Sequence, residues 1–273
     1  MADKKLMIID GNSIANRAFY GIRMLTSKSG QFTNAIYGYL NILFKHIEEN
    51  RPDYICSAFD LSGPTFRNKM FDGYKAHRKG MPDELAAQLP VLKQVLDALG
   101  VMVLEKEGYE ADDIIGTIAG RCEADDVECM IVTGDKDDLQ LATDRTRVYL
   151  TTTQKGMTST TVYAAKEVED CYGVTPEEFI DVKAIMGDPS DNIPGVSGIG
   201  EKGALELIKK YKSIEKLYEA LDADADADAD AESALFKGAQ RKKLIDGREM
   251  AFLSKQLATI DKAVPIEFSF DDF

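Results

Sequence analysis

The segment Leu6-Met7-Ile8-Ile9-Asp10-Gly11-Asn12 decides the fold class of this chain. Four consecutive apolar residues predict a short buried strand, and the Asp-Gly pair predicts that it ends in a turn. Similar apolar runs occur at residues 54–59, 101–104, 129–132 and 147–150, with helical spacing at 35–49 and 85–99 and shorter helices at 111–122 and 137–142. This alternation predicts an α/β fold with a mostly parallel sheet and helices on both faces.

Strand patterns end near residue 165, and the second half of the chain is predicted to be helical. The predicted helices are 167–172, 176–186, 201–211, 214–221, 234–245 and 249–257. We therefore expect a core domain at 1–165 and a helical lobe at 166–273. Residues 222–230 alternate Asp and Ala, which predicts a solvated acidic linker because the carboxylates repel one another and alanine buries little surface.

The composition limits the classes of protein that the chain can represent. Four cysteines without a CxxC pair and only two histidines argue against a zinc site or a disulfide framework. No apolar run approaches the ~20 residues of a membrane span, and the first is too short for a signal peptide, so we expect a cytoplasmic protein. The net charge of −14 would argue against nucleic-acid binding unless metal ions neutralise some of the acids.

Aspartates follow three of the predicted strands. Asp10, Asp60 and Asp135 each stand at the carboxyl end of an apolar run. In open α/β sheets these ends form one edge, where ligands bind. Each aspartate alone is equally well explained by helix capping or turn chemistry, but three at one edge favour a ligand set.

More acids accompany these three. Glu110, Asp112 and Asp113 open a predicted helix, Asp137 follows Asp135 by two positions, and Asp188 and Asp191 lie three apart near a turn. Neighbouring carboxylates repel one another unless a cation lies among them. Nine oxygen-only candidates predict a hard cation, Mg²⁺ or Mn²⁺, and exceed what one ion needs, so we expect two ions about 4 Å apart, as in phosphodiester cleavage.

Two further segments are candidates for nucleic-acid contacts. Residues 64–80 interleave Arg67, Lys75 and Arg78 with aromatic residues that include Tyr74, a composition that suits a single strand but also a solvated loop. Residues 193–203 are rich in glycine, and Gly195, Gly198 and Gly200 precede Lys202 and a predicted helix. Backbone N–H groups there suit a phosphate, although the glycines also suit a tight turn between helices.

In their order, these segments resemble the 5′-nuclease domain of bacterial DNA polymerase I, within the flap endonuclease and 5′–3′ exonuclease family. The matching motifs are Ile9-Asp10-Gly11-Asn12, Phe59-Asp60, Phe66-Arg67, Gly73-Tyr74-Lys75-Ala76-His77-Arg78, the segment 108–113, Thr133-Gly134-Asp135-Lys136-Asp137, Gly187-Asp188-Pro189-Ser190-Asp191-Asn192, and the segment 194–200. One departure is Asp138, where the family usually has an apolar residue; its charge has no obvious purpose in the sequence.

The resemblance implies a PIN-like core, a helical arch at about 64–99 and a helix–three-turn–helix element at about 187–211 that grips duplex DNA and often holds K⁺. It implies two divalent ions, the first held by Asp10, Asp60, Glu110 and Asp112 and the second by Asp113, Asp135, Asp137, Asp188 and Asp191. Lys75 and Arg78 match residues that bind the scissile phosphate and, with Asp10 and Asp113, form the expected catalytic set. Tyr74 matches a residue that stacks on a base.

We therefore expect a structure-selective 5′–3′ exonuclease and flap endonuclease of bacterial replication and repair. Its partners would be branched, flapped or nicked DNA and RNA–DNA primer junctions, and it would act as a monomer, away from membranes, alone or attached to a polymerase domain. A PIN-like ribonuclease and a non-catalytic junction-binding module remain as alternatives. A phosphatase with an Asp-x-Asp nucleophile is disfavoured because Asn12 stands where the second aspartate is needed.

Overall fold

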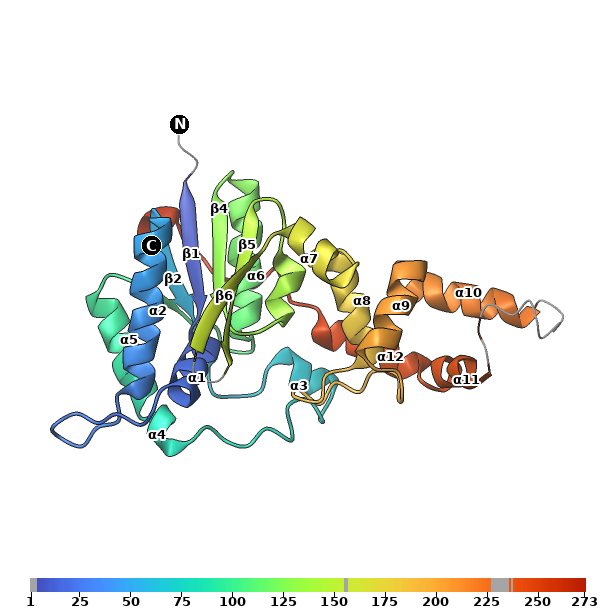
Figure 1. The fold of residues 1–273 in the computed structure, drawn as a ribbon, viewed down its shortest axis with the longest axis horizontal. Helices are drawn as coiled ribbons and strands as arrows, with labels where there is room; N and C mark the ends of the chain where they lie inside the picture. Colours follow the sequence, from blue (N-terminus) through green and yellow to red (C-terminus); the bar gives the residue numbers. More distant parts are fainter. Residues whose placement is uncertain (1–3, 155–156, 227–235, 237) are drawn as a thin grey trace. The chain divides into compact units, whose positions relative to one another are not determined.

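The apolar runs of the first half form one six-stranded sheet (Figure 1). The structure is a computed structural model that describes residues 4–154, 157–226, 236 and 238–273. The strand order is β3-β2-β1-β4-β5-β6, and only β6 is antiparallel to its neighbour. The strands are β1 (Lys5–Asp10), β2 (Tyr54–Ala58), β3 (Met102–Leu104), β4 (Glu128–Thr133), β5 (Thr146–Gln154) and β6 (Met157–Tyr163). The predicted mostly parallel sheet is confirmed.

The register of the central strands aligns their carboxyl ends. Asp10 in β1 is opposite Ala58 in β2, and Ile9 is opposite Val132 in β4. The acids that follow β2 and β4 therefore start from the same edge of the sheet as Asp10. Sequence analysis did not predict β6, although its run of threonines ending in Val-Tyr is typical of a strand.

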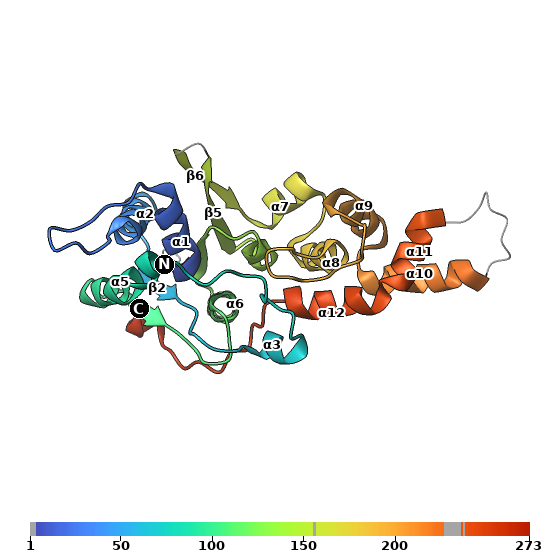
Figure 2. The same cartoon turned by 90° about the horizontal axis from the view of Figure 1, so that it is seen from below.

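Helices cover both faces of this sheet (Figures 1 and 2). One face carries α1 (Gly11–Gly21), α2 (Asn34–Asn50) and α5 (Gln88–Ala98), whose buried side chains form one apolar cluster with Met7 and Ile9 of β1 and Met130 and Val132 of β4. The alternate residues of these strands face α6 (Ala111–Ala124), which buries Ile114, Ile115 and Ile118. Helix α1 was not among the predicted helices, although its apolar residues have helical spacing.

The second half of the chain is helical, as predicted. It contains α7 (Ala165–Tyr172), α8 (Pro176–Met186), α9 (Glu201–Tyr211), α10 (Ile214–Asp226), α11 (Gly238–Asp246) and α12 (Arg248–Ala258). Thr175 and Glu178 form a capping box that fixes the start of α8. Asp181 of α8 forms an ion pair with Lys255 of α12 at 2.7 Å, so these two helices are tied together.

The acidic tract differs from the expected linker in its first part. Helix α10 continues to Asp226, because alanine favours a helix and Asp222 forms a two-pronged ion pair with Arg248 at 2.9 Å. Residues 222–226 are thus helical, and 227–230 lie outside the described residues.

The chain divides into two compact units, and this division differs from a single boundary at residue 165. The first unit comprises residues up to Thr65, Lys79–Ala164 and Ile260–Phe273, and the second comprises Phe66–Arg78 and Ala165–Thr259. The segment expected to form an arch is therefore divided: α3 (Phe66–Met70) belongs to the second unit, whereas α4 (Asp83–Ala86) and α5 belong to the first.

The C-terminal segment returns to the first unit. The backbone N–H of Ile260 donates to Gln140 at 3.0 Å, and that of Val264 donates to the hydroxyl of Thr117 at 3.0 Å. A side chain at Gly116 would meet Ile260 at 2.6 Å, so the glycine lets this segment lie directly on α6. The segment ends in a short 3₁₀ turn, η2 (Phe270–Asp272).

Within the described residues, no helix is long and apolar enough to cross a membrane.

Candidate metal centre and nucleic-acid interface

The first carboxylate of the candidate site stands where β1 passes into α1. Asp10 is the N-cap of α1: one of its oxygens accepts the N–H of Ser13 at 3.0 Å and the other accepts the hydroxyl of Thr133 at 3.0 Å. The pKa of Asp10 is raised to about 7, mainly by burial and also by the charges of Asp60 and Asp135, against the hydrogen bond from Ser13. Asp10 is therefore both a cap and an electrostatically strained acid, a state that a cation would relieve.

Asp60 and the start of α6 meet at the same edge. An oxygen of Asp60 accepts the N–H of Ala111 at 2.8 Å, so the turn after β2 is fixed to the first residue of α6. Glu110 is the N-cap and is 7% exposed. The sequence-predicted acids of both segments are thus brought together with Asp10.

Asp113 has a structural task in this arrangement. One of its oxygens accepts the N–H of Glu110 at 3.0 Å, and the other accepts the N–H of Asp261 at 2.9 Å. The carboxylate is fully buried and completes the capping box of α6. Asp113 therefore secures both the helix start and the returning C-terminal segment, whatever it adds to metal binding.

The third group of acids follows β4. Asp135 accepts the N–H of Asp137 at 3.0 Å in a tight turn that leads into the 3₁₀ helix η1 (Asp137–Leu141). Within η1, Asp138 is fully buried, and neither of its carboxylate oxygens has a hydrogen-bond partner. Burial, together with the charges of Asp10 and Asp135, raises the pKa of Asp138 well above its usual range.

One oxygen each from Asp10, Asp112 and Asp138 lies within 4.8 Å of the others. This donor set fits a hard divalent cation, because carboxylate oxygens are the ligands that Mg²⁺ and Mn²⁺ prefer and the buried charges require neutralisation. Asp10 and Asp112 were among the predicted ligands but Asp138 was not, since the spacing of Asp135, Asp137 and Asp138 does not reveal which side chain turns inward.

The second unit holds the remaining two predicted ligands. Asp188 accepts Lys183 at 2.6 Å and the backbone and hydroxyl of Ser190 at 2.8 and 2.6 Å. Burial would raise the pKa of Asp188, but these hydrogen bonds hold it below its ordinary value. Its backbone pairs in both directions with that of Ile193, at 2.9 and 2.8 Å, which closes the turn that carries Asp191.

Asp191 gathers the predicted phosphate-binding residues. Its carboxylate forms an ion pair with Arg78, lies 3.8 Å from the Lys75 ammonium and accepts the hydroxyl of Tyr74 at 3.4 Å. Lys75 has a left-handed backbone with φ of 55°, and its N–H donates to the carbonyl of Asp191 at 2.8 Å. A cation at Asp191 or a phosphate at Arg78 and Lys75 would compete with these ion pairs.

Two residues expected to contact DNA are buried. Arg67 is 3% exposed, and its guanidinium donates to the carbonyls of Leu257 and Thr259 at 2.8 and 2.9 Å. Tyr74 is 4% exposed and packs with Ile193 and Leu257. Both side chains therefore stabilise the second unit and neither faces solvent. Some of the basic and aromatic residues of 64–80 thus belong to the interior of this unit.

The glycine-rich turn depends on a close backbone crossing. A side chain at Gly195, whose φ is 60°, would meet the backbone N of Gly187 at 2.3 Å, so the chain can cross there only without side chains. The carbonyl of Gly198 accepts the ammonium of Lys243 at 2.9 Å, and α9 begins directly after Gly200. Lys202 is exposed in its first turn. The turn therefore presents backbone groups and one cation at a helix N-terminus.

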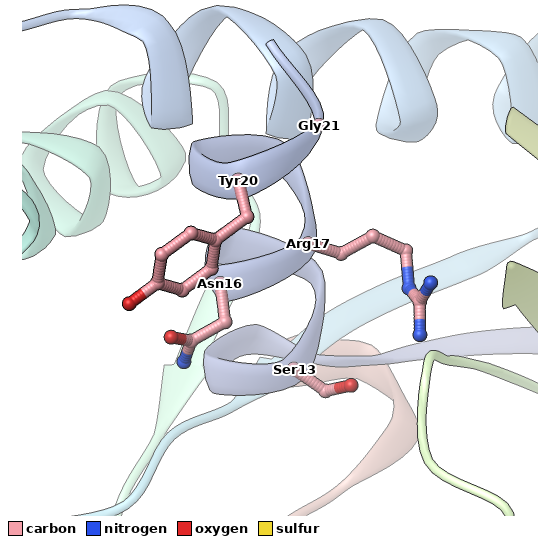
Figure 3. Close-up of a pocket in the computed structure, with 5 residues that line it drawn as sticks. All are labelled: Ser13, Asn16, Arg17, Tyr20 and Gly21. Carbon is pink, nitrogen blue, oxygen red and sulfur yellow. The ribbon is translucent and has the colours of Figure 1, made fainter. Parts of the chain in front are cut away.

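A surface pocket that sequence analysis did not predict lies along α1 (Figure 3). It is lined by Ser13, Asn16, Arg17, Tyr20 and Gly21. Arg17 donates to the carbonyl of Gly134 at 2.8 Å, which ties α1 to the turn before Asp135. Tyr20 is 72% exposed. The spacing of these polar residues along the helix that begins at Asp10 is the signal that would have revealed this face.

The mostly parallel sheet with acids at the carboxyl ends of its strands, and the helical unit with its glycine-rich turn, define an α/β nuclease. The chain belongs to the 5′–3′ exonuclease family: residues 5–173 match the model of its N-terminal resolvase-like domain, and residues 174–273 match that of its C-terminal SAM fold.

Relatives and solved structures agree with this placement. DNA polymerase I of Bacillus subtilis is 45% identical over 267 residues, covering 97% of this chain and 29% of that protein, and the Caldicellulosiruptor bescii enzyme is 41% identical over 98% of this chain and 30% of its own length. The chain thus spans about three tenths of the curated relatives it matches.

Two solved structures share the fold. The zinc-bound T5 5′-exonuclease superposes with a TM-score of 0.72 at 23% identity, covering 94% of this chain and 90% of that one. The bacteriophage T5 D15 flap endonuclease complex with DNA and metal ions gives 0.70 at 22% identity, covering 95% and 89%.

Proposed function

We propose that this chain is a structure-selective 5′–3′ exonuclease and 5′-flap endonuclease that hydrolyses DNA phosphodiester bonds with two divalent ions, Mg²⁺ or Mn²⁺. The observation that carries the proposal is the meeting of carboxylate oxygens of Asp10, Asp112 and Asp138 within 4.8 Å, at the carboxyl edge of a parallel sheet. The same three residues lie in a chain whose length is covered by the models of a nuclease family.

The carboxylates of the first unit would hold the ions. Asp10, Asp60, Glu110, Asp112, Asp113, Asp135 and Asp137 are the expected ligands there, and Asp188 and Asp191 are those expected from the second unit. When bound, divalent ions lower the pKa of a coordinated water and neutralise charge on the phosphate. The backbone hydrogen bonds to Asp10, Asp60 and Asp135 fix these carboxylates before an ion binds, so little order is lost on binding.

The basic residues of the second unit would bind the DNA backbone. Arg78 and Lys75 would exchange Asp191 for a phosphate oxygen of the substrate, because a phosphate accepts the same kind of charge-assisted hydrogen bond. The N-terminus of α9, with Gly195, Gly198, Gly200 and Lys202, would bind a duplex phosphate, and a K⁺ ion in this turn remains a prediction.

The substrate and setting follow from the relatives. DNA polymerase I proteins match over only about three tenths of their length, so we propose that this chain is the nuclease part of such a polymerase, acting in the bacterial cytoplasm on flaps, nicks and RNA–DNA primer junctions. Bacteriophage T5 flap endonuclease with DNA and the Rad2 catalytic core with DNA, at a TM-score of 0.57 and 15% identity, support a DNA substrate. We propose a monomer, which light scattering of the purified protein would test.

A cleavage assay tests the proposed activity. Wild type with Mg²⁺ should cut a labelled double-flap DNA near the junction, leaving a 5′ phosphate, whereas chelation or Asp112→Asn should abolish cutting. Asp144→Asn, an exposed acid of the same unit, makes the same charge change and should cut normally. A matched RNA flap separates this function from that of a ribonuclease. Tight DNA binding without cutting in every condition would refute the nuclease and favour a junction-binding module.

A further inference from the structure

Asp138 is an acid that the family motif does not explain. The side chain is fully buried at the start of η1, and both of its oxygens are without a hydrogen-bond partner. The hydroxyl of Thr133 donates its proton to Asp10. A buried carboxylate without a donor is costly, so the position needs either a proton or a cation.

The local backbone turns Asp138 toward the metal centre. A 3₁₀ helix has about three residues per turn, so the side chains of Asp137 and Asp138 leave η1 about 120° apart. An oxygen of Asp138 lies within 4.8 Å of one from Asp10 and one from Asp112. These three side chains come from the end of β1, from η1 after β4 and from the first turn of α6, so three separate elements converge on this point.

The spacing suits a single hard ion. Two oxygens on opposite sides of Mg²⁺, with bonds of about 2.1 Å, are about 4.2 Å apart, and larger hard ions allow about 5 Å. Only one pair of the three oxygens can lie on opposite sides of an ion, so the 4.8 Å limit means that the side chains would close in by up to about 1 Å to share it. An exposed acidic cluster would lack this feature, but here one member is buried and unpartnered, and one of its oxygens lies within 4.8 Å of the others.

We propose that Asp138 is a further carboxylate ligand of the metal centre, joining Asp10 and Asp112 around one divalent ion. The proposal deepens the proposed nuclease function, since it concerns the same site, and assigns a ligand that the resemblance places as an apolar residue. It gives the extra charge of this chain a purpose: tighter retention of one ion.

The proposal predicts opposite effects on metal binding and on stability. Removing the carboxylate takes away one ligand, so the ion should bind more weakly. The same change removes a buried carboxyl group whose oxygens have no hydrogen-bond partner, so the metal-free protein should be as stable as wild type or more stable. A residue with a purely structural role would lower stability and leave metal affinity unchanged.

Mn²⁺ binding to the metal-free protein tests the proposal directly. Free Mn²⁺ would be followed by electron paramagnetic resonance during titration of wild type, Asp138→Asn, which keeps the shape, and Asp138→Leu, which restores an apolar residue. We expect both variants to bind Mn²⁺ at least about tenfold more weakly at one site, since even the loss of a group behind a ligand costs that much. Asp144→Asn should bind as wild type does.

Two results would overturn the proposal. Affinity for Mn²⁺ within twofold of wild type in Asp138→Asn would show that this acid is no ligand, and so would a loss of metal-free stability in that near-isosteric variant without a loss of affinity. Flap cleavage, measured in parallel, keeps the two proposals apart. If wild type cuts and the variants keep their Mn²⁺ affinity, Asp138 is no ligand but the nuclease function stands. If the variants bind Mn²⁺ more weakly and wild type does not cut, Asp138 is a ligand but the nuclease function is refuted.

Discussion

Replacing Asp113 by alanine should destabilise the protein even where no metal is present. Its two oxygens accept the N–H groups of Glu110 and Asp261 at 3.0 and 2.9 Å, and the side chain is fully buried. The first of these N–H groups is itself buried, and leaving such a group without an acceptor costs about 1–3 kcal/mol. With the partly buried second bond, we expect the free energy of unfolding to fall by about 2–4 kcal/mol.

Urea unfolding in the presence of a chelator measures this loss without any contribution from bound ions. Asp113→Asn keeps one acceptor oxygen and should lose about half as much. Asp144→Ala, at an exposed acid of the same unit, is the matched control and should change stability by less than about 1 kcal/mol. A loss below about 1 kcal/mol in Asp113→Ala would refute the structural role.

The structural role of Asp113 affects how a loss of nuclease activity in its variants is interpreted. A nuclease defect in Asp113→Ala would mix lost folding with lost metal binding, because the capping box of α6 and the C-terminal segment both depend on this carboxylate. Asp112, which joins the metal cluster from the next position, is the better residue for testing the chemistry.

Three further predictions follow from single contacts. Gly11→Ala would place a methyl group 2.4 Å from the Phe59 ring, so the free energy of unfolding should fall by about 1–3 kcal/mol in thermal unfolding; an unchanged midpoint would contradict the packing described. Arg67→Ala should lower the free energy of unfolding by about 2–4 kcal/mol, since two backbone carbonyls near the end of α12 lose their charged donor. Arg67→Lys should recover little of this loss in the same assay, and full recovery would show that the charge alone matters. In chelator, the free energy of unfolding should fall as pH rises from 5 to 8. The pKa of Asp10 is raised from 3.8 to about 7 on folding, so the stability that this residue contributes is full below the unfolded pKa and is lost as pH passes about 7. Asp10→Asn should reduce this loss by about 2 kcal/mol, and an equal or steeper fall in the variant would disprove the linkage.

Much of the architecture could be predicted because it depends on local periodicity. The runs Leu6–Ile9 and 129–132 are buried on both faces of the parallel sheet, so they are continuous apolar segments that stand out in the sequence. The helices of the second half have apolar stripes of helical spacing. Strand β6 was not predicted because it is antiparallel, threonine-rich and at the sheet edge, where no continuous apolar run is required.

The sequence by itself determined the alternation of strands and helices, the strand-end positions of Asp10, Asp60 and Asp135, and the glycines that the turn at Gly195 requires. Each is a local property, set by residue type and spacing along the chain. Only the tertiary structure decided which acids meet, because the direction of a side chain depends on the backbone turn and on packing from distant segments. It turned Asp138 inward beside Asp10, engaged Asp113 with the returning C-terminal segment, and buried Arg67 in the helical unit.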